Sequence, residues 1–232
     1  MLKPIVKILS LILIILGLNS GCTKDSYSLD NYWLSYGEVI GENPNYKVRL
    51  DDGTILNITI NRVPQLNVTD GQRVIADYTI VGEEQISGPV TSRNAILNYL
   101  HNVLTKSPLL SSEVATPAKQ DSLGYDKADI SEAWVSNKYL NVHFDVFRQN
   151  PNLKHLVNLV VDTERSTETQ VYLAFRHNAF NDVPALHSLG KVSFDISTIL
   201  DGVSTGESID LHLIWDSYGY GEKQYTIKYT KQ

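Results

Sequence analysis

The sequence predicts an all-β protein, and three observations support that fold class. Segments of alternating apolar and polar residues recur along the chain, turn residues separate them, and very few segments have helical spacing. Hydrophobic residues make up 42% of the 232 residues and charged residues 20%, which is typical of globular proteins and argues against a disordered chain. The single cysteine excludes a disulfide scaffold and a thiolate metal cluster within one chain.

The N-terminus has the pattern of a secretory signal. Two lysines precede a short run of leucine and isoleucine at residues 8–18, and small residues follow it up to Cys22. The run is shorter than the roughly 20 residues that a stable membrane span needs, and an uncleaved anchor is the alternative. Gly21 and Cys22 resemble the cleavage site of a bacterial lipoprotein. This predicts a signal peptide over residues 1–21 and acylation of Cys22, with a free thiol in a plain secreted protein as the alternative.

Cleavage and acylation would make the membrane a partner of the mature protein, through Cys22. Anchoring by more than one acyl chain is stable, since each buried methylene contributes about 0.8 kcal/mol and one chain alone is marginal. Thr23 stands where an aspartate holds some lipoproteins in the inner membrane, so we expect the outer membrane. Residues 22–31 are interpreted as a tether. Loss of the two lysines with the signal changes the net charge from −6 to −8.

The first half of the mature chain predicts strands joined by tight turns. The turn Asp51-Asp52-Gly53 between two alternating segments is a strong hairpin signal. Residues 96–104 are ambiguous, because their apolar residues have helical spacing but could also belong to a strand that ends near Tyr99. The other strands are expected at residues 33–40, 46–50, 55–60 and 73–81.

Beyond residue 128 the alternation becomes regular and predicts a two-sheet sandwich. Each predicted strand has one apolar face, which a second layer must cover. Residues 197–200 are expected to form one helical turn, and residues 107–127, rich in serine and proline, are interpreted as a linker. The strands are expected near residues 130–135, 140–146, 157–161, 171–175, 192–196, 209–215 and 225–229.

Several of these segments resemble a known family. Residues 27–33 with Gly37, and residues 46–54, are similar to the start of NigD-like lipoproteins, and residues 139–142 and 175–178 resemble their second half. The resemblance covers nearly all of the mature chain, and its motifs are strand and turn patterns without a catalytic signature.

The resemblance implies both an architecture and a role. It implies a small OB-type barrel over residues 32–106, closed by a strand at residues 96–99, followed by an antiparallel β-sandwich over residues 128–232. It also implies an immunity-like role toward a bacteriocin. No established active site or cofactor comes with it.

The best polar cluster in the sequence is Arg176, His177 and Asn178 together with Asp182. It lies at a predicted strand end that leads into a loop, where binding residues concentrate. In a ligand site, Arg176 would bind an anion and His177 would hydrogen-bond it. Asn178 and Asp182 are also typical turn builders, so a purely structural turn is the alternative.

A second candidate is an aromatic platform of Tyr32, Trp33 and Tyr36, since OB barrels often bind ligands across one face. Packing of these rings in the barrel or its mouth is the alternative. Nucleic acid is not expected as a partner, because the mature chain is acidic and lies outside the cytoplasm. The six histidines show no ligand spacing, so neither a metal site nor catalytic residues are predicted.

These observations favour a lipid-anchored outer-membrane protein without catalysis. Its partner would be an envelope protein, a toxin or a glycan that docks on the barrel face or on the sandwich loops. Two alternatives stay open: an enzyme that acts on envelope or dietary polysaccharide, and a structural subunit of a larger surface complex.

Overall fold

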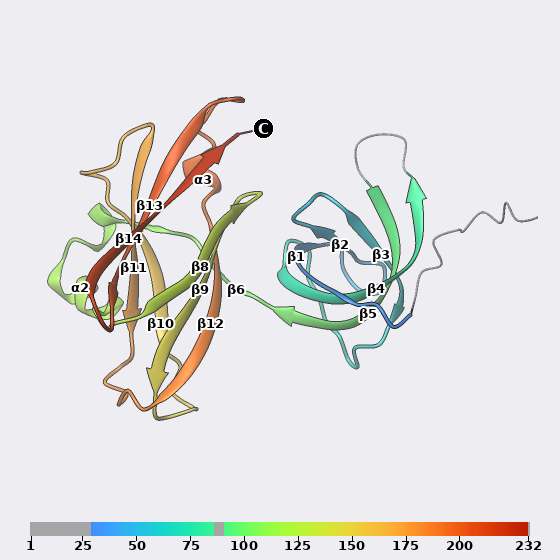
Figure 1. Ribbon diagram of the computed structural model, residues 1–232, viewed down its shortest axis with the longest axis horizontal. Coiled ribbons are helices and arrows are strands. Elements are labelled where there is room, and N and C mark those ends of the chain that lie inside the picture. Colours follow the sequence, from blue (N-terminus) through green and yellow to red (C-terminus); the bar gives the residue numbers. More distant parts are fainter. Residues whose placement is uncertain (1–28, 86–90, 232) are drawn as a thin grey trace, which may run out of the picture.

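The computed structural model describes residues 29–85 and 91–231, which form two β-rich domains (Figure 1). The predicted signal peptide at residues 1–21 and the predicted acylation of Cys22 lie outside the described residues. Within the described part of the chain, no helix is both long and apolar enough to cross a membrane. The predicted all-β fold class is confirmed, because nearly all the described elements are strands.

The N-terminal domain is a closed five-stranded barrel with the strand order β1-β2-β3-β5-β4. β5 closes the barrel, because it pairs in parallel with β3 and antiparallel with β4. Buried apolar residues such as Val39, Val48 and Leu56 fill its interior. The barrel implied by the family resemblance is confirmed. Its strands are β1 (Trp33–Ile40), β2 (Lys47–Leu50), β3 (Ile55–Asn61), β4 (Arg73–Gln85) and β5 (Thr91–Asn102).

A β-bulge explains the helical spacing of residues 96–104. The pairing of β4 with β5 skips Asn98, so Asn98 is an extra residue in β5. The extra residue shifts the alternation by one position, and Leu97 and Leu100 both join the barrel core at a spacing of three. The strand interpretation is therefore confirmed and the helical interpretation is wrong.

The C-terminal domain is the predicted sandwich, with two sheets packed face to face (Figure 1). The five-stranded sheet has the order β14-β13-β11-β10-β7, and the four-stranded sheet has the order β6-β12-β9-β8. The first sheet contains β7 (Leu109–Leu110), β10 (Leu156–Val161), β11 (Gln170–Asn178), β13 (Ser208–Ser217) and β14 (Gly221–Thr230). The second contains β6 (Leu104–Lys106), β8 (Asp129–Ser136), β9 (Tyr139–Arg148) and β12 (Leu186–Asp195).

The core of the sandwich consists of the alternating residues that the sequence places on one face of each strand. Leu140 and Val142 of β9 and Leu211 and Leu213 of β13 are completely buried between the sheets. The predicted helical turn is present as α3 (Ser197–Leu200).

The segment between the two predicted domains belongs to the sandwich. β6 pairs in parallel with β12, and β7 pairs in parallel with β10. The 3₁₀-helix η1 (Ser111–Val114) and the helix α2 (Pro117–Leu123) pack against β10 through Val114, Leu123 and Val160. The sequence suggests a linker at residues 107–127 because short parallel strands find their partners far along the chain and leave little local pattern.

Candidate functional site

The predicted polar cluster lies where β11 ends and the next loop begins. Alternation along β11 places His177 on the inner side of the sheet, where it is 2% exposed, and places Arg176 and Asn178 on the outer side. Asp182 follows in the loop. The structure brings His177 and Asp182 to one site and directs Arg176 and Asn178 to another.

Arg176 and Asn178 hold the C-terminal end of α2. Arg176 Nε donates to the carbonyl oxygen of Gly124 at 2.9 Å, and its guanidinium lies 3.6 Å from the ring centre of Tyr125. Asn178 Nδ2 donates to the carbonyl oxygen of Ser122 at 3.0 Å. These contacts fix α2 against the sheet, and an anion-binding role for Arg176 stays a prediction.

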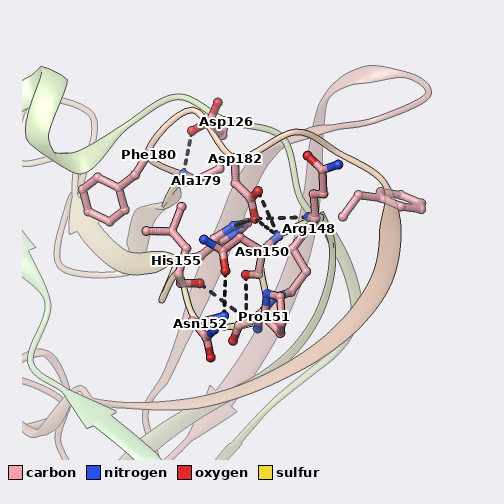
Figure 2. A network of polar contacts seen from close by, with 12 residues as sticks. Asp126, Arg148, Asn150, Pro151, Asn152, His155, Ala179, Phe180 and Asp182 are labelled. Carbon is pink, nitrogen blue, oxygen red and sulfur yellow. Dashed lines mark hydrogen bonds and ion pairs between the residues drawn. The ribbon is translucent and has the colours of Figure 1, made fainter.

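His177 and Asp182 are connected through a third residue, His155, and Figure 2 shows His155 beside Asp182. His155 Nε2 lies 3.1 Å from Asp182 Oδ2, and His155 Nδ1 lies 2.9 Å from His177 Nε2. His177 Nδ1 in turn lies 2.9 Å from the carbonyl oxygen of Lys127. We call this chain of contacts, from Asp182 through His155 and His177 to Lys127, the histidine relay. The sequence does not indicate His155, which comes from the loop between β9 and β10, 22 positions before His177.

The histidine relay requires one proton more than two neutral histidines carry. Both of its ends are acceptors, a carboxylate and a carbonyl, so three hydrogen bonds need three protons on the four ring nitrogens. Two neutral imidazoles supply only two. Burial lowers the pKa of His177. The hydrogen bond to the Lys127 carbonyl raises this pKa, but burial has the larger effect. The lowered pKa disfavours placing this third proton on His177.

Asp182 also binds the backbone of the neighbouring loop. Its side chain is 4% exposed, and its two oxygens accept the N–H groups of Gln149 and Asn150 at 3.2 Å. Burial raises the pKa of Asp182, but the hydrogen bonds from His155 and from these N–H groups outweigh burial and hold the pKa below its usual value. The ionised carboxylate thus ties the loop before β10 to the loop after β11.

The loop after β11 has an uncommon backbone and displays apolar side chains. Phe180 and Asn181 both have positive φ, 54° and 61°, a region that a bulky residue rarely adopts. Figure 2 shows the Phe180 ring pointing away from the histidine relay, and the residue is 48% exposed. Val183 in the same loop and Leu186, the first residue of β12, are exposed as well. We call Phe180, Val183 and Leu186 the apolar loop surface.

The histidine relay has no nucleophile bonded to it. In the described part of the chain, the ring nitrogens of His155 and His177 contact each other, Asp182 and the Lys127 carbonyl, and no serine, threonine or cysteine. The described residues also contain no group of three or more side chains placed to hold a metal ion. The geometry suits holding loops in position.

The sequence also contains a Gly-x-Ser-x-Gly pentapeptide at residues 202–206, which was not among the candidates above. This pattern is typical of the nucleophile turn of hydrolases. In those enzymes the serine stands between a strand and the helix that follows. Here the pentapeptide lies between α3 and β13, and the N–H of Ser204 donates to Glu207 Oε2 at 3.0 Å within a turn. The context is therefore that of a simple turn.

The three aromatic residues of the predicted platform do not share one surface. Tyr32 is exposed, and Trp33 stacks on Tyr78 with ring centres 6.2 Å apart. Tyr36 instead faces the sandwich, where its hydroxyl lies 2.8 Å from Nε2 of His143. Burial raises the pKa of Tyr36 to about 12.

A buried arginine joins the barrel to the sandwich. The side chain of Arg73 is fully buried, and it donates to both carboxylate oxygens of Asp51, at 2.5 and 2.7 Å. It also donates to Asn141 Oδ1 of β9 at 2.9 Å, and it lies 4.4 Å from the ring centre of Tyr139. The polar face of β9 with Asn141 and His143 therefore lies against the barrel. We call Arg73 with these partners the interdomain lock.

The fold and the site define a two-domain β protein. At the site, the histidine relay connects the loop before β10 to the loop after β11, and no catalytic centre is recognisable among the described residues. Two family models match the chain: residues 36–103 match a NigD-like N-terminal OB domain and residues 111–229 match a NigD-like C-terminal beta sandwich domain. The chain therefore belongs to the NigD-like family, as the resemblance in the sequence implies.

Solved structures from Parabacteroides and Bacteroides species share this fold over most of the chain. A protein of Parabacteroides distasonis that is called toxin-related is 27% identical, covers 87% of this chain and 95% of its own, and superposes with a TM-score of 0.71. A NigD-like immunity protein of Bacteroides caccae is 18% identical, with coverages of 89% and 100% and a TM-score of 0.65. A protein of Bacteroides fragilis called a lipoprotein is 15% identical, with coverages of 87% and 99% and a TM-score of 0.58. No curated protein matches the sequence.

Proposed function

We propose that this chain is a lipid-anchored protein of the outer membrane that acts by binding a toxin protein, in an immunity-like role, and not by catalysis. The contact surface in this proposal is the apolar loop surface of the sandwich. Three findings support it: the family, the loop geometry and the lipoprotein-like signal that ends at Cys22.

The loop geometry is the observation on which the proposal depends. The histidine relay and Asp182 hold the loop from two sides, while consecutive left-handed residues turn Phe180 outward. A strained, exposed and well-anchored apolar residue is expensive for a purely structural loop, and such residues concentrate at functional sites. A rigid loop also loses little entropy when it binds, which favours a protein partner.

The polar groups of the site support binding over catalysis. The ring nitrogens of His155 and His177 and the carboxylate of Asp182 are all engaged inside the protein, so none is free to transfer a proton to a substrate. The names of two similar proteins, one called toxin-related and one an immunity protein, favour a toxin as the partner class.

The test is a protection assay in the native host. A strain that lacks the gene is exposed to culture supernatant of a bacteriocin-producing relative, and growth is compared with that of the parent. We expect greater sensitivity, which the wild-type gene restores. A deletion strain that is no more sensitive than its parent to any active supernatant would refute the immunity role.

Two variants assign the effect to the surface and to the anchor. Phe180→Asn with Leu186→Ser removes apolar area while asparagine accepts the left-handed backbone, so this variant should fold but not restore protection. Tyr99→Ser is the control, because Tyr99 is an aromatic residue of the barrel that is 57% exposed against 48% for Phe180, and this variant should restore protection. Cys22→Ala should abolish both labelling by radioactive palmitate and protection. Protection by an unlabelled Cys22→Ala chain would refute the need for an anchor.

A further inference from the structure

β14 is a long edge strand with one unpaired side. In the described part of the chain, β14 pairs with β13 and with no other strand. It has ten residues, most of them exposed, and Tyr225 at its centre is 51% exposed. It contains neither proline nor an irregularity in its pairing, two of the devices that commonly protect an edge.

The hydrophobic core is least covered beside this edge. Several apolar residues of the two edge strands β8 and β14 pack against the core but remain partly exposed: Ile130, Ala133, Val135, Ile227 and Tyr229. A cleft of about 600 Å³ lies between the ends of β8 and β14. An additional strand on β14 would extend the sheet and cover part of this opening.

The backbone of β14 fixes which residues could bond to such a strand. The N–H and C=O of Lys231 both bond toward the chain before β13, to Glu207 and Gly206. Because these groups alternate in direction along an antiparallel strand, the odd-numbered residues point toward β13 and the even-numbered residues point outward. The contact between Thr226 and His212 is consistent with this direction. Thr226 Oγ1 lies 2.9 Å from His212 Nδ1, and side chains approach this closely in a non-hydrogen-bonded pair.

One register of β14 on a second β14 is complementary in charge. Centred on Tyr225, it makes Tyr225 a close non-hydrogen-bonded pair with itself, and it places Glu222 opposite Lys228 twice. All the outward N–H and C=O groups from Glu222 to Lys228 then find partners, in about eight backbone hydrogen bonds. Lysines on an edge normally discourage pairing, but here Lys228 meets a carboxylate and Lys223 meets Ile227.

We propose that β14 is a self-association edge, on which a second copy of this chain adds its own β14 in antiparallel orientation about a two-fold axis at Tyr225. Neither Glu222 nor Lys228 forms an ion pair within the described part of its own chain, so both are available across the axis. The inference is independent of the toxin-binding role, because the apolar loop surface lies on other segments.

Cysteine cross-linking of the full chain in intact cells tests the register. In the proposed pair, the two Tyr225 positions are a non-hydrogen-bonded pair with Cα atoms about 4.5 Å apart, within the range of a disulfide. Tyr225→Cys should therefore give a covalent dimer under mild oxidation. Lys223→Cys, on the same face two residues away, is separated from its own copy by roughly 13 Å along the strand and should not. Tyr99→Cys on the barrel and the unchanged chain are the blanks.

Charge reversal provides an independent test. Glu222→Lys in the Tyr225→Cys background places like charges opposite each other twice and should lower the cross-linked fraction about fivefold. Lys228→Glu should do the same, and the two changes together should restore the dimer. Tyr225→Cys that cross-links no more than Tyr99→Cys, or no more than Lys223→Cys, would overturn the proposal. A covalent adduct with a different envelope protein instead of a dimer would also overturn it and would assign the edge to that partner.

Discussion

Replacing Arg73 with methionine should loosen the whole molecule, because this residue bridges the two domains from a fully buried position. Its guanidinium makes two hydrogen bonds to Asp51 and one to Asn141, and it packs against Tyr139. Methionine keeps most of the apolar contact area, so the variant reports on the charge and the hydrogen bonds of the interdomain lock.

The magnitude follows from the burial of each partner. Removing one member of a buried ion pair typically costs about 3–5 kcal/mol. The side chain of Asp51 is 18% exposed and regains some hydration, which favours the lower end of that range. Asn141 is completely buried and loses the Arg73 donor, but Ser193 Oγ still donates to the same oxygen at 2.6 Å, so this lost hydrogen bond costs about 1 kcal/mol. These effects overlap, and we expect a total loss of about 3 kcal/mol.

Urea unfolding of the mature chain, followed by tryptophan fluorescence, measures this loss. With a slope of about 2 kcal/mol per molar urea, the midpoint should fall by about 1.5 M. Arg62→Met is the control, because Arg62 is exposed and donates to Asn98 at 3.1 Å on the barrel surface; it should change stability by less than about 0.5 kcal/mol. If Arg73→Met were no more destabilising than Arg62→Met, the interdomain lock would not be buried as described.

Three further outcomes follow from the site and the interface. Acid should destabilise the protein. The lowered pKa of His177 contributes stability that is lost as the pH falls below the unfolded value of 6.5, and the lowered pKa of Asp182 contributes stability that is lost at still lower pH. The melting temperature of His177→Gln should therefore change less between pH 7 and pH 5 than that of the unchanged chain. Gly124→Ala should cost more than about 2 kcal/mol in urea unfolding, because its φ is +75° and an added Cβ would lie 2.4 Å from a backbone oxygen; Gly206→Ala, with φ +83° and open space, should cost about 1 kcal/mol. Tyr36→Phe should lose about 1 kcal/mol with its hydrogen bond to the sandwich, measured by the same titration.

The strands were predictable because their signal is local. Leu140 and Val142 face the core for the same reason that they alternate in the sequence, and Gly53 stands at the turn where a positive φ of 86° is needed. β6 and β7 were not predictable, because they hold only a few residues and their partners lie far along the chain. The bulge at Asn98 misled the helical interpretation, because one extra residue turns a spacing of two into three.

The site was only partly predictable, for the same physical reason. Arg176, His177 and Asp182 are close in the sequence, so their clustering was visible. Strand alternation then separates Arg176 from the others, and the residue that connects His177 to Asp182 comes from another loop. The interdomain lock left no signal either, since Arg73 and Asn141 are 68 positions apart and each looks like a surface residue of an alternating strand.

The proposed self-association edge is geometrically compatible with the proposed lipid anchor. A two-fold axis that joins two antiparallel edge strands into one sheet runs perpendicular to that sheet. The corresponding faces of the two copies therefore point to the same side of the joined sheet. The four-stranded sheet covers one face of the sheet that contains β14, and the interdomain lock holds the barrel beyond it, on the outer side of β9 (Figure 1). Both barrels of the pair therefore lie on the same side. The two chains also enter their barrels, at Trp33, on the same side of the pair, as anchoring of both copies in one membrane would require. A pairing that placed the barrels on opposite sides would be incompatible with two anchors in one bilayer, whereas the proposed antiparallel pairing of the two β14 strands is compatible with them.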